Sequence, residues 1–161
     1  MVINATKKGL ITGLLMVCAG ILMFWKDVPL NSPLQYIGFL IFGAGIVWAV
    51  YAAAKWSGAR FGTLFNQGFR CFVVVALIMS VYTFIFWKAN PEIINKNIAE
   101  TKAYLLKNPQ DRTPAEIEEQ AKNTLKYYIP IKVSGSVFGY LLTGVVVTTV
   151  VAGILSLSKK N

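Results

Sequence analysis

Histidine is absent from this chain of 161 residues, and acidic residues are scarce outside one segment. Without histidine the chain lacks the commonest general base and metal ligand of proteins. Charged residues make up only 14% of the chain, whereas about a quarter is typical of soluble domains, and hydrophobic residues make up 55%. A soluble domain of this length would need more charge to cover its surface. These absences argue against acid–base or metal-dependent catalysis and against a soluble fold.

Cysteine is scarce as well. The chain has two cysteines, Cys18 and Cys71, and each falls within or beside an apolar block. We interpret them as packing residues rather than as a disulfide or a metal-binding pair. We therefore expect no catalytic residue, no metal site and no cofactor, and we predict that the protein is not an enzyme.

Uncharged apolar blocks dominate the rest of the sequence. Four of them contain no Asp, Glu, Lys or Arg: Gly9–Trp25, Leu34–Ala54, Cys71–Trp87 and Val133–Ser158. A helix needs about 20 residues to cross a hydrocarbon core of about 30 Å. The sequence therefore predicts an all-α membrane protein, a single integral membrane domain over residues 1–161. Its four transmembrane helices are expected at about 9–26, 34–55, 69–88 and 132–157.

The one long polar segment runs from Lys88 to Pro130 and holds six of the seven acidic residues. Asn90-Pro91 is typical of a helix start, and Asn108-Pro109 is typical of a helix end. Thr113-Pro114-Ala115-Glu116 has the spacing of a capping box, and Pro130 is expected to end the second helix. The segment therefore predicts a helical hairpin over residues 90–129.

The distribution of basic residues predicts how the chain is threaded. Lys and Arg without acidic neighbours occur before the first block, between the second and third, and after the fourth: Lys7, Lys8, Lys55, Arg60, Arg70, Lys159 and Lys160. The positive-inside rule places such residues in the cytoplasm. We expect a multi-pass protein of the cytoplasmic (inner) membrane with both termini cytoplasmic and residues 89–131 periplasmic or extracellular. This distribution favours anionic lipid head groups over nucleic acid as the partner of the net charge of +9. The basic start and first apolar block resemble a signal peptide, but no small-x-small site follows, so we expect a retained span.

The loop KWSGARFGTLFNQGFR mixes glycine, aromatic and basic residues. Such a composition is typical of an interfacial turn, with rings at the acyl boundary and guanidinium groups at the level of the phosphates. An alternative is a polar nest for a lipid phosphate or a loop of a partner, made by Arg60, Asn66, Gln67 and Arg70.

Small residues recur at helical spacing in two of the blocks. Gly9 and Gly13 form a GxxxG in the first block, and Gly135 and Gly139 form another in the fourth. In lipid such residues let helix backbones approach closely. We interpret all four as helix-packing positions, either within the chain or against a second copy.

The whole chain resembles the DUF4199 family of small bacterial membrane proteins, known mainly from Bacteroidetes. The resemblance rests on the FNQGF motif (Phe65–Phe69), where the family tends toward FGQAF, on Asn90-Pro91-Glu92, and on the region of Gly135 and Gly139. It implies four helices of unknown function and no active site. It also implies a polyprenol-phosphate glycosyltransferase as a possible partner, because members are often encoded beside such an enzyme.

These features favour a non-enzymatic accessory or scaffold subunit. Its expected partners are the lipid bilayer, another membrane protein or a second copy of itself. The alternative is a small transporter or an oligomeric pore. That alternative is less favoured because the blocks offer few polar groups at mid-membrane depth.

Overall fold

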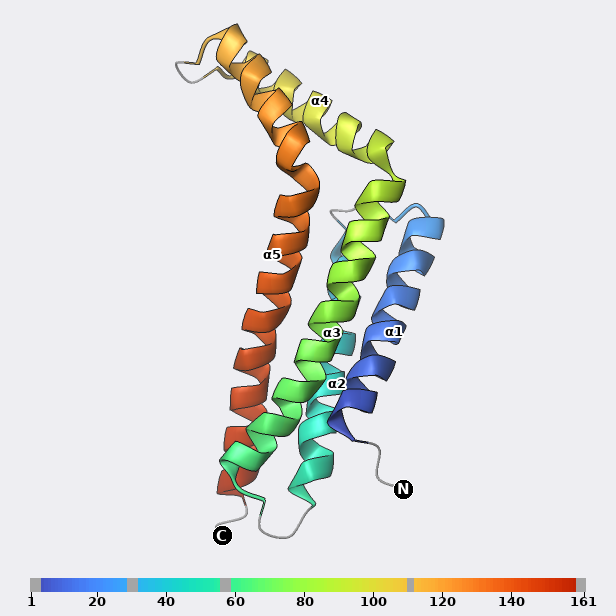
Figure 1. Cartoon of the computed structure of the whole chain (residues 1–161), viewed down its shortest axis with the longest axis vertical. Helices are drawn as coiled ribbons and strands as arrows, with labels where there is room; N and C mark the ends of the chain where they lie inside the picture. Colours follow the sequence, from blue (N-terminus) through green and yellow to red (C-terminus); the bar gives the residue numbers. More distant parts are fainter. Residues whose placement is uncertain (1–3, 29–31, 56–58, 110–111, 159–161) are drawn as a thin grey trace. The chain divides into compact units, whose positions relative to one another are not determined.

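The computed structural model of the chain describes residues 4–28, 32–55, 59–109 and 112–158, and the regular elements within these ranges are all helices (Figure 1). The elements in order are α1 (Ala5–Trp25), a short 3₁₀ helix (Pro33–Gln35), α2 (Tyr36–Ala54), α3 (Phe61–Ala89), α4 (Pro91–Lys107) and α5 (Pro114–Leu157). The predicted all-α class is confirmed. Lys159 and Lys160, which we expected to end the last span, lie outside the described residues.

Four helices, α1, α2, α3 and α5, are long and apolar enough to cross a membrane. Their outward sides carry large apolar side chains that no protein atom covers, such as Leu40 (71% exposed) and Phe138 (68% exposed). Contiguous apolar surface on this scale is unfavourable in water and is satisfied by lipid. The chain is therefore a multi-pass membrane protein with four candidate spans.

The chain forms two compact units. The four-helix unit comprises residues 1–80 and 136–161, and the α4–α5 unit comprises residues 81–135. Helices α3 and α5 each contribute to both units.

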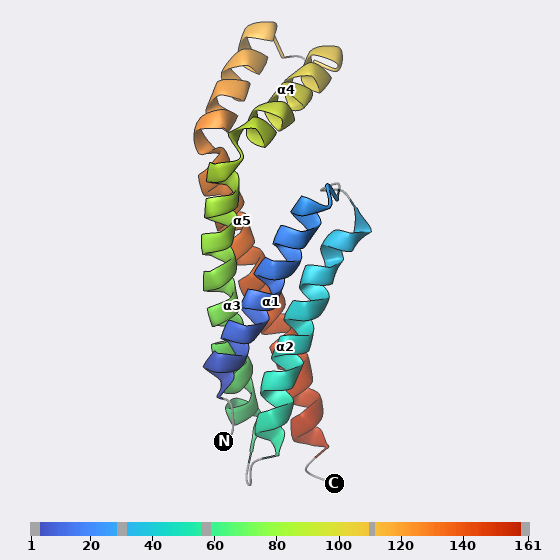
Figure 2. The ribbon, with the colours of Figure 1, turned by 90° about the vertical axis from the view of Figure 1, so that its right-hand side faces the viewer.

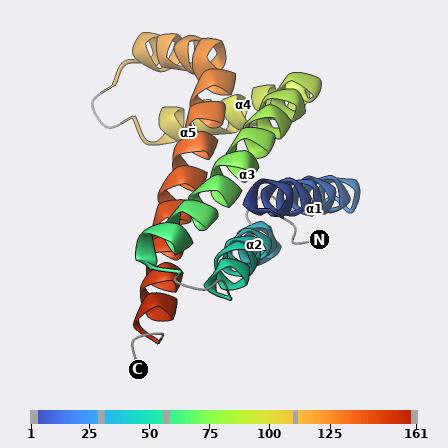
Figure 3. The ribbon, with the colours of Figure 1, turned by 60° about the horizontal axis from the view of Figure 1, so that its bottom comes forward.

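In the four-helix unit, α1 and α2 lie side by side, as two views agree (Figures 2 and 3). We call the base of this unit the end at which α1 and α3 begin and α2 and α5 end (Figure 1). The interior is filled by fully buried Phe42 and Ile46 of α2 and by Phe72 and Val75 of α3. The helices approach closely where glycine faces a side chain of a neighbouring helix, because glycine has no side chain to hold the backbones apart.

Helix α3 begins at Phe61, eight residues before the predicted start of the third span. The prediction that the FGTLFNQGFR stretch is an interfacial turn is therefore wrong for residues 61–70, while residues 56–58 lie outside the described ranges. The stretch is helical because it packs: Leu64 is fully buried, and a methyl group on Gly68 would overlap the side chain of Thr148 in α5. The 29 residues of α3 span about 43 Å, more than the hydrocarbon core of about 30 Å.

Helix α5 runs through Pro130, so the prediction that this proline ends the helix is also wrong. Proline removes one backbone hydrogen bond and clashes with the carbonyl one turn earlier. The two apolar residues just before it are packed, with Tyr128 buried and Ile129 half-buried in the core of the α4–α5 unit. Proline in a helix near a membrane is tolerated when tertiary packing offsets its local cost.

Candidate functional site

The α4–α5 unit has a small core of its own. Trp87 of α3, Ile94 of α4 and Tyr128 of α5 are buried together. The rings of Trp87 and Tyr128 meet edge to face with their centroids 5.1 Å apart, a favoured aromatic geometry. This contact joins the last turn of α3 to the first half of α5.

Polar groups complete this core. The side-chain amide of Asn97 donates a hydrogen bond of 3.0 Å to the hydroxyl of Tyr128. The ammonium group of Lys132 lies 5.7 Å from the Trp87 ring and 5.4 Å from the Tyr128 ring. A cation beside two aromatic faces is stabilised by both ring quadrupoles.

Both ends of α4 and the start of α5 lie at the predicted positions. The Thr113–Glu116 capping box is present: the Thr113 N–H donates to the Glu116 carboxylate at 2.6 Å, and the Glu116 N–H donates to the Thr113 hydroxyl at 3.3 Å. These bonds from the Thr113 backbone and hydroxyl lower the pKa of Glu116. At α4, Asn90 occupies the N-cap position with Pro91 at the first helical position. The Asn90 side chain does not cap that helix but donates to the Phe86 carbonyl at 2.7 Å.

Lys102 of α4 and Glu118 of α5 form an ion pair that ties the two helices together. The hydrogen bond from Lys102 is the main cause that lowers the pKa of Glu118. Both side chains are partly exposed. The pair therefore orients α4 against α5 more than it stabilises them.

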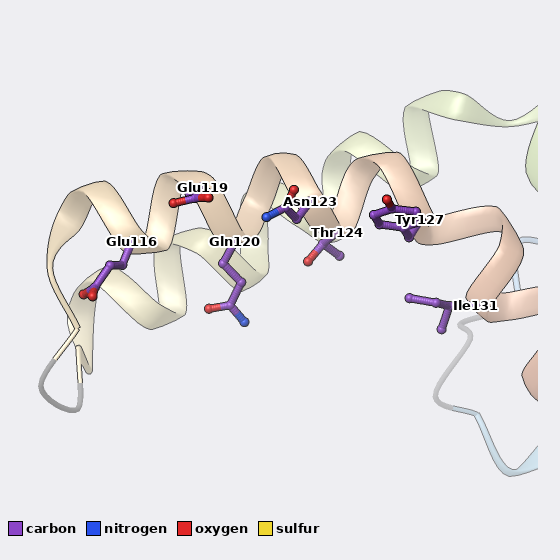
Figure 4. Close-up of a pocket in the computed structure, with 7 residues that line it drawn as sticks. All are labelled: Glu116, Glu119, Gln120, Asn123, Thr124, Tyr127 and Ile131. Carbon is purple, nitrogen blue, oxygen red and sulfur yellow. The ribbon is translucent and has the colours of Figure 1, made fainter.

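A shallow, open hollow of about 480 Å³ lies along the flank of α5 (Figure 4). Two of its lining residues, Gln120 and Thr124, also line the space between α4 and α5. Its lining is polar toward the start of α5 and apolar toward its middle: Glu116, Glu119, Gln120, Asn123, Thr124, Tyr127 and Ile131. Tyr127 and Ile131 are 50% and 62% exposed. The hollow thus offers hydrogen-bonding groups beside a half-exposed aromatic ring, a combination typical of protein-binding surfaces.

The four predicted polar residues lie at the start of α3. The structure joins two of them: the Nε of exposed Arg70 donates to the Oδ1 of exposed Asn66 at 3.2 Å. Arg60 lies just before the helix and is exposed, and Gln67 is half-buried. The Asn66–Arg70 bond uses the Nε of the guanidinium, whose two terminal nitrogens are further hydrogen-bond donors.

The four predicted packing glycines fall into two pairs. A methyl group on Gly9 would lie 2.5 Å from the Cys71 carbonyl oxygen, and one on Gly13 would lie 2.7 Å from Ile78. Gly135 and Gly139 have no neighbouring atom within 4 Å of such a methyl group. The first pair therefore sits against α3, and the second pair faces space that no described part of the chain fills.

Sequence reasoning missed a buried lysine at the base of the four-helix unit. Lys8 is only 4% exposed. Its ammonium group lies 5.4 Å from the centre of the Trp48 ring and 3.5 Å from the Trp48 carbonyl oxygen. The helical spacing of the sequence could have indicated that Lys8 is buried, because Lys8 and Thr12 share one face of α1 with Gly9 and Gly13. Lys7, its neighbour in sequence, is exposed.

Among the described residues, no three His, Cys, Asp or Glu side chains come together as metal ligands would. The surfaces that the structure does define are the α5 flank, the start of α3 and the base of the four-helix unit. All three suit binding.

Comparison with known proteins gives one match. No curated protein and no solved structure matches the chain. A family model described as a protein of unknown function matches residues 7–156, which is nearly the whole chain. The chain therefore belongs to the DUF4199 family.

Proposed function

We propose that this protein is a non-enzymatic accessory subunit that binds another membrane protein through the flank of α5. The observation that carries the proposal is the hollow on that flank, with Tyr127 and Ile131 half-exposed along it. Exposed aromatic side chains beside polar groups are the usual anchors of protein interfaces. Tyr127 and Ile131 are not part of the core of the α4–α5 unit, so their exposed surface is available to a partner.

The proposed topology puts this flank outside the cytoplasm. Both termini and the basic start of α3 are proposed to lie in the cytoplasm of a bacterial inner membrane, following the positive-inside rule. The segment of residues 89–131 then faces the periplasm or the cell exterior. A partner would approach with its own extracytoplasmic loop or helix end.

The lining of the hollow indicates the chemistry of that partner segment. Glu116 and Glu119 stand at one end, and Tyr127 and Ile131 at the other. Such a lining suits a segment with basic or amide side chains farther from the membrane and apolar side chains closer to it. Because family members are often encoded beside a polyprenol-phosphate glycosyltransferase, such an enzyme is the first partner to test.

The experiment is cross-linking in native membranes followed by mass spectrometry, with the tagged chain as bait. We expect one dominant partner, a different membrane protein, with cross-links that map to residues 114–131. Tyr127→Ala should reduce its recovery about tenfold or more, as truncation of an interface aromatic commonly does. Tyr104→Ala is the matched control, since Tyr104 of α4 is 65% exposed but does not line the hollow.

Other outcomes would redirect the proposal. If only self-cross-links appear, the accessory role fails and a homo-oligomer becomes the working hypothesis. Solute or ion flux through liposomes that contain the purified protein would then test an oligomeric pore. Equal losses of the partner with Tyr127→Ala and Tyr104→Ala would show that the α5 flank is not the interface.

A further inference from the structure

A buried ammonium group at the base of the four-helix unit has no acidic partner among the residues that the structure describes. Lys8 is 96% covered, yet the four-helix unit contains a single acidic residue, Asp27, which follows the far end of α1. Buried charges are costly unless they are paired. The contacts that the structure gives the Lys8 ammonium are the Trp48 ring and a long hydrogen bond to the Trp48 carbonyl. These contacts are too weak to offset the loss of water around a full positive charge.

A second cation lies along the same face of α2. Trp48, Tyr51 and Lys55 are spaced three and four residues apart and therefore share one side of the helix. The Lys55 ammonium lies 5.1 Å from the centre of the Tyr51 ring. Trp48 and Tyr51 are 41% and 53% exposed. Two aromatic rings, each with a lysine against it, thus form a surface open to lipid, about 10 Å long from Trp48 to Lys55.

This surface stands where lipid head groups lie. Lys8 immediately precedes the uncharged block of α1, and Lys55 immediately follows that of α2. Tryptophan, tyrosine and lysine at the end of a span are typical of the membrane–water interface. The anion abundant at that depth is the phosphate of a phospholipid.

We propose that Lys8, Trp48, Tyr51 and Lys55 form a binding site for the head group of an anionic glycerophospholipid in the leaflet that surrounds the base of the four-helix unit. The phosphate accepts hydrogen bonds from the Lys8 ammonium and neutralises its charge. Lys55 attracts the head group from one and a half to two turns farther along α2. The two rings pack against the glycerol and the first acyl carbons. This site shares no residue with the four polar residues at the start of α3 and does not depend on the proposed accessory role.

The test is native mass spectrometry of the full-length protein in a neutral detergent with equimolar phosphatidylglycerol and phosphatidylcholine. The readout is the ratio of the two lipids retained by the protein. We expect the wild type to prefer phosphatidylglycerol. Lys8→Met should lower this preference about tenfold or more, because a hydrogen bond to a charged group is lost. Lys7→Met removes the same charge from the adjacent exposed position and should change the ratio less than twofold.

Two further variants keep the test decisive if Lys8→Met folds poorly. Lys8→Arg keeps the charge and should keep most of the preference. Lys55→Met changes an exposed side chain that packs into no core and should lower the preference severalfold. Equal losses with Lys7→Met and Lys8→Met, or equal retention of both lipids by the wild type, would overturn the proposal. Displacement of phosphatidylglycerol by excess inorganic phosphate would also overturn it, since the site would then recognise a free anion.

Discussion

Two glycines of α5 should respond in opposite ways to the same substitution. Gly144 is buried, and a methyl group there would lie 2.5, 2.7 and 2.8 Å from three atoms of the Phe72 side chain. Carbon atoms pack at about 3.5–4.0 Å, so the phenyl ring must move by about 1 Å. Phe72 is 1% exposed and meets Phe69 edge to face on another side, which leaves it little room.

The expected magnitudes follow from these contacts. Inserting a methyl group into a packed interior costs about 1–3 kcal/mol, whereas replacing glycine by alanine in a helix contributes about 0.5–1 kcal/mol. Gly144→Ala should therefore lower the free energy of unfolding by about 1–2 kcal/mol. Gly139→Ala, with no atom within 4 Å of the new methyl group, should raise it by up to about 1 kcal/mol.

The assay is equilibrium unfolding of both variants and the wild type in mixed micelles of a mild detergent and increasing dodecyl sulfate, followed by circular dichroism. Gly68→Ala is a second packed position, where the methyl group would overlap Thr148 and lie 2.9 Å from Val50. It should resemble Gly144→Ala. If Gly139→Ala destabilises the protein as much as Gly144→Ala, the packing described for α5 is refuted.

Three other substitutions test the polar contacts. Tyr128→Phe removes the hydroxyl that accepts a hydrogen bond from Asn97 and should lower the stability of the α4–α5 unit by about 1–2 kcal/mol. The α4 amides should then exchange faster with solvent deuterium, and unchanged exchange would contradict the contact. The lowered pKa of Glu116 means that its stabilising contribution is fully present above the usual glutamate pKa of about 4.3 and is lost as the pH falls through the lowered value. The protection factors of the amides in the first turn of α5, which correct for the intrinsic pH dependence of exchange, should therefore fall at acid pH in the wild type. In Glu116→Gln they should be low and nearly independent of this titration, and the same pH dependence in both proteins would exclude the Thr113 bonds as its cause. Thr148→Val replaces a fully buried hydroxyl that has no hydrogen-bond partner among the described residues, so unfolding in dodecyl sulfate should show equal or greater stability, and a loss above about 1 kcal/mol would reveal a partner.

The spans were predictable because a bilayer imposes a simple requirement. A helix that crosses it must be apolar for about 20 residues, and four uncharged blocks meet that requirement without reference to tertiary contacts. The start of α5 was predictable for a similar reason: the Thr113–Glu116 capping box is a local arrangement within four residues.

Features that depend on contacts distant in sequence were not predictable. The stretch from Phe61 to Arg70 has the composition of an interfacial turn, and it is helical because Leu64 and Gly68 pack into the unit. The partner of Gly68 is Thr148, eighty residues later, which no local pattern indicates. Proline at position 130 is locally a helix breaker, and the packed core around it outweighs that preference.

The buried lysine shows a different limit of sequence reasoning. Lys7 and Lys8 are equivalent as topological signals, because the positive-inside rule counts charges and ignores their direction. Their positions on the helix distinguish the two lysines: Lys8 lies on the face of α1 that packs against α2 and α3, whereas Lys7 does not. The face of a helix, rather than the charge count at its end, therefore distinguishes a candidate binding residue from a topological anchor.

The glycines extend this argument from charge to packing. A glycine in a helix costs about 0.5–1 kcal/mol relative to alanine, and a close contact with a neighbouring helix can offset that cost. Gly9, Gly13 and Gly144 have such contacts within the four-helix unit. Gly135 and Gly139 of α5 bear the same cost with no neighbour from the described parts of this chain, beside the exposed Phe138. A helix of another membrane protein, or of a second copy of this chain, packed on this face would supply the missing contact.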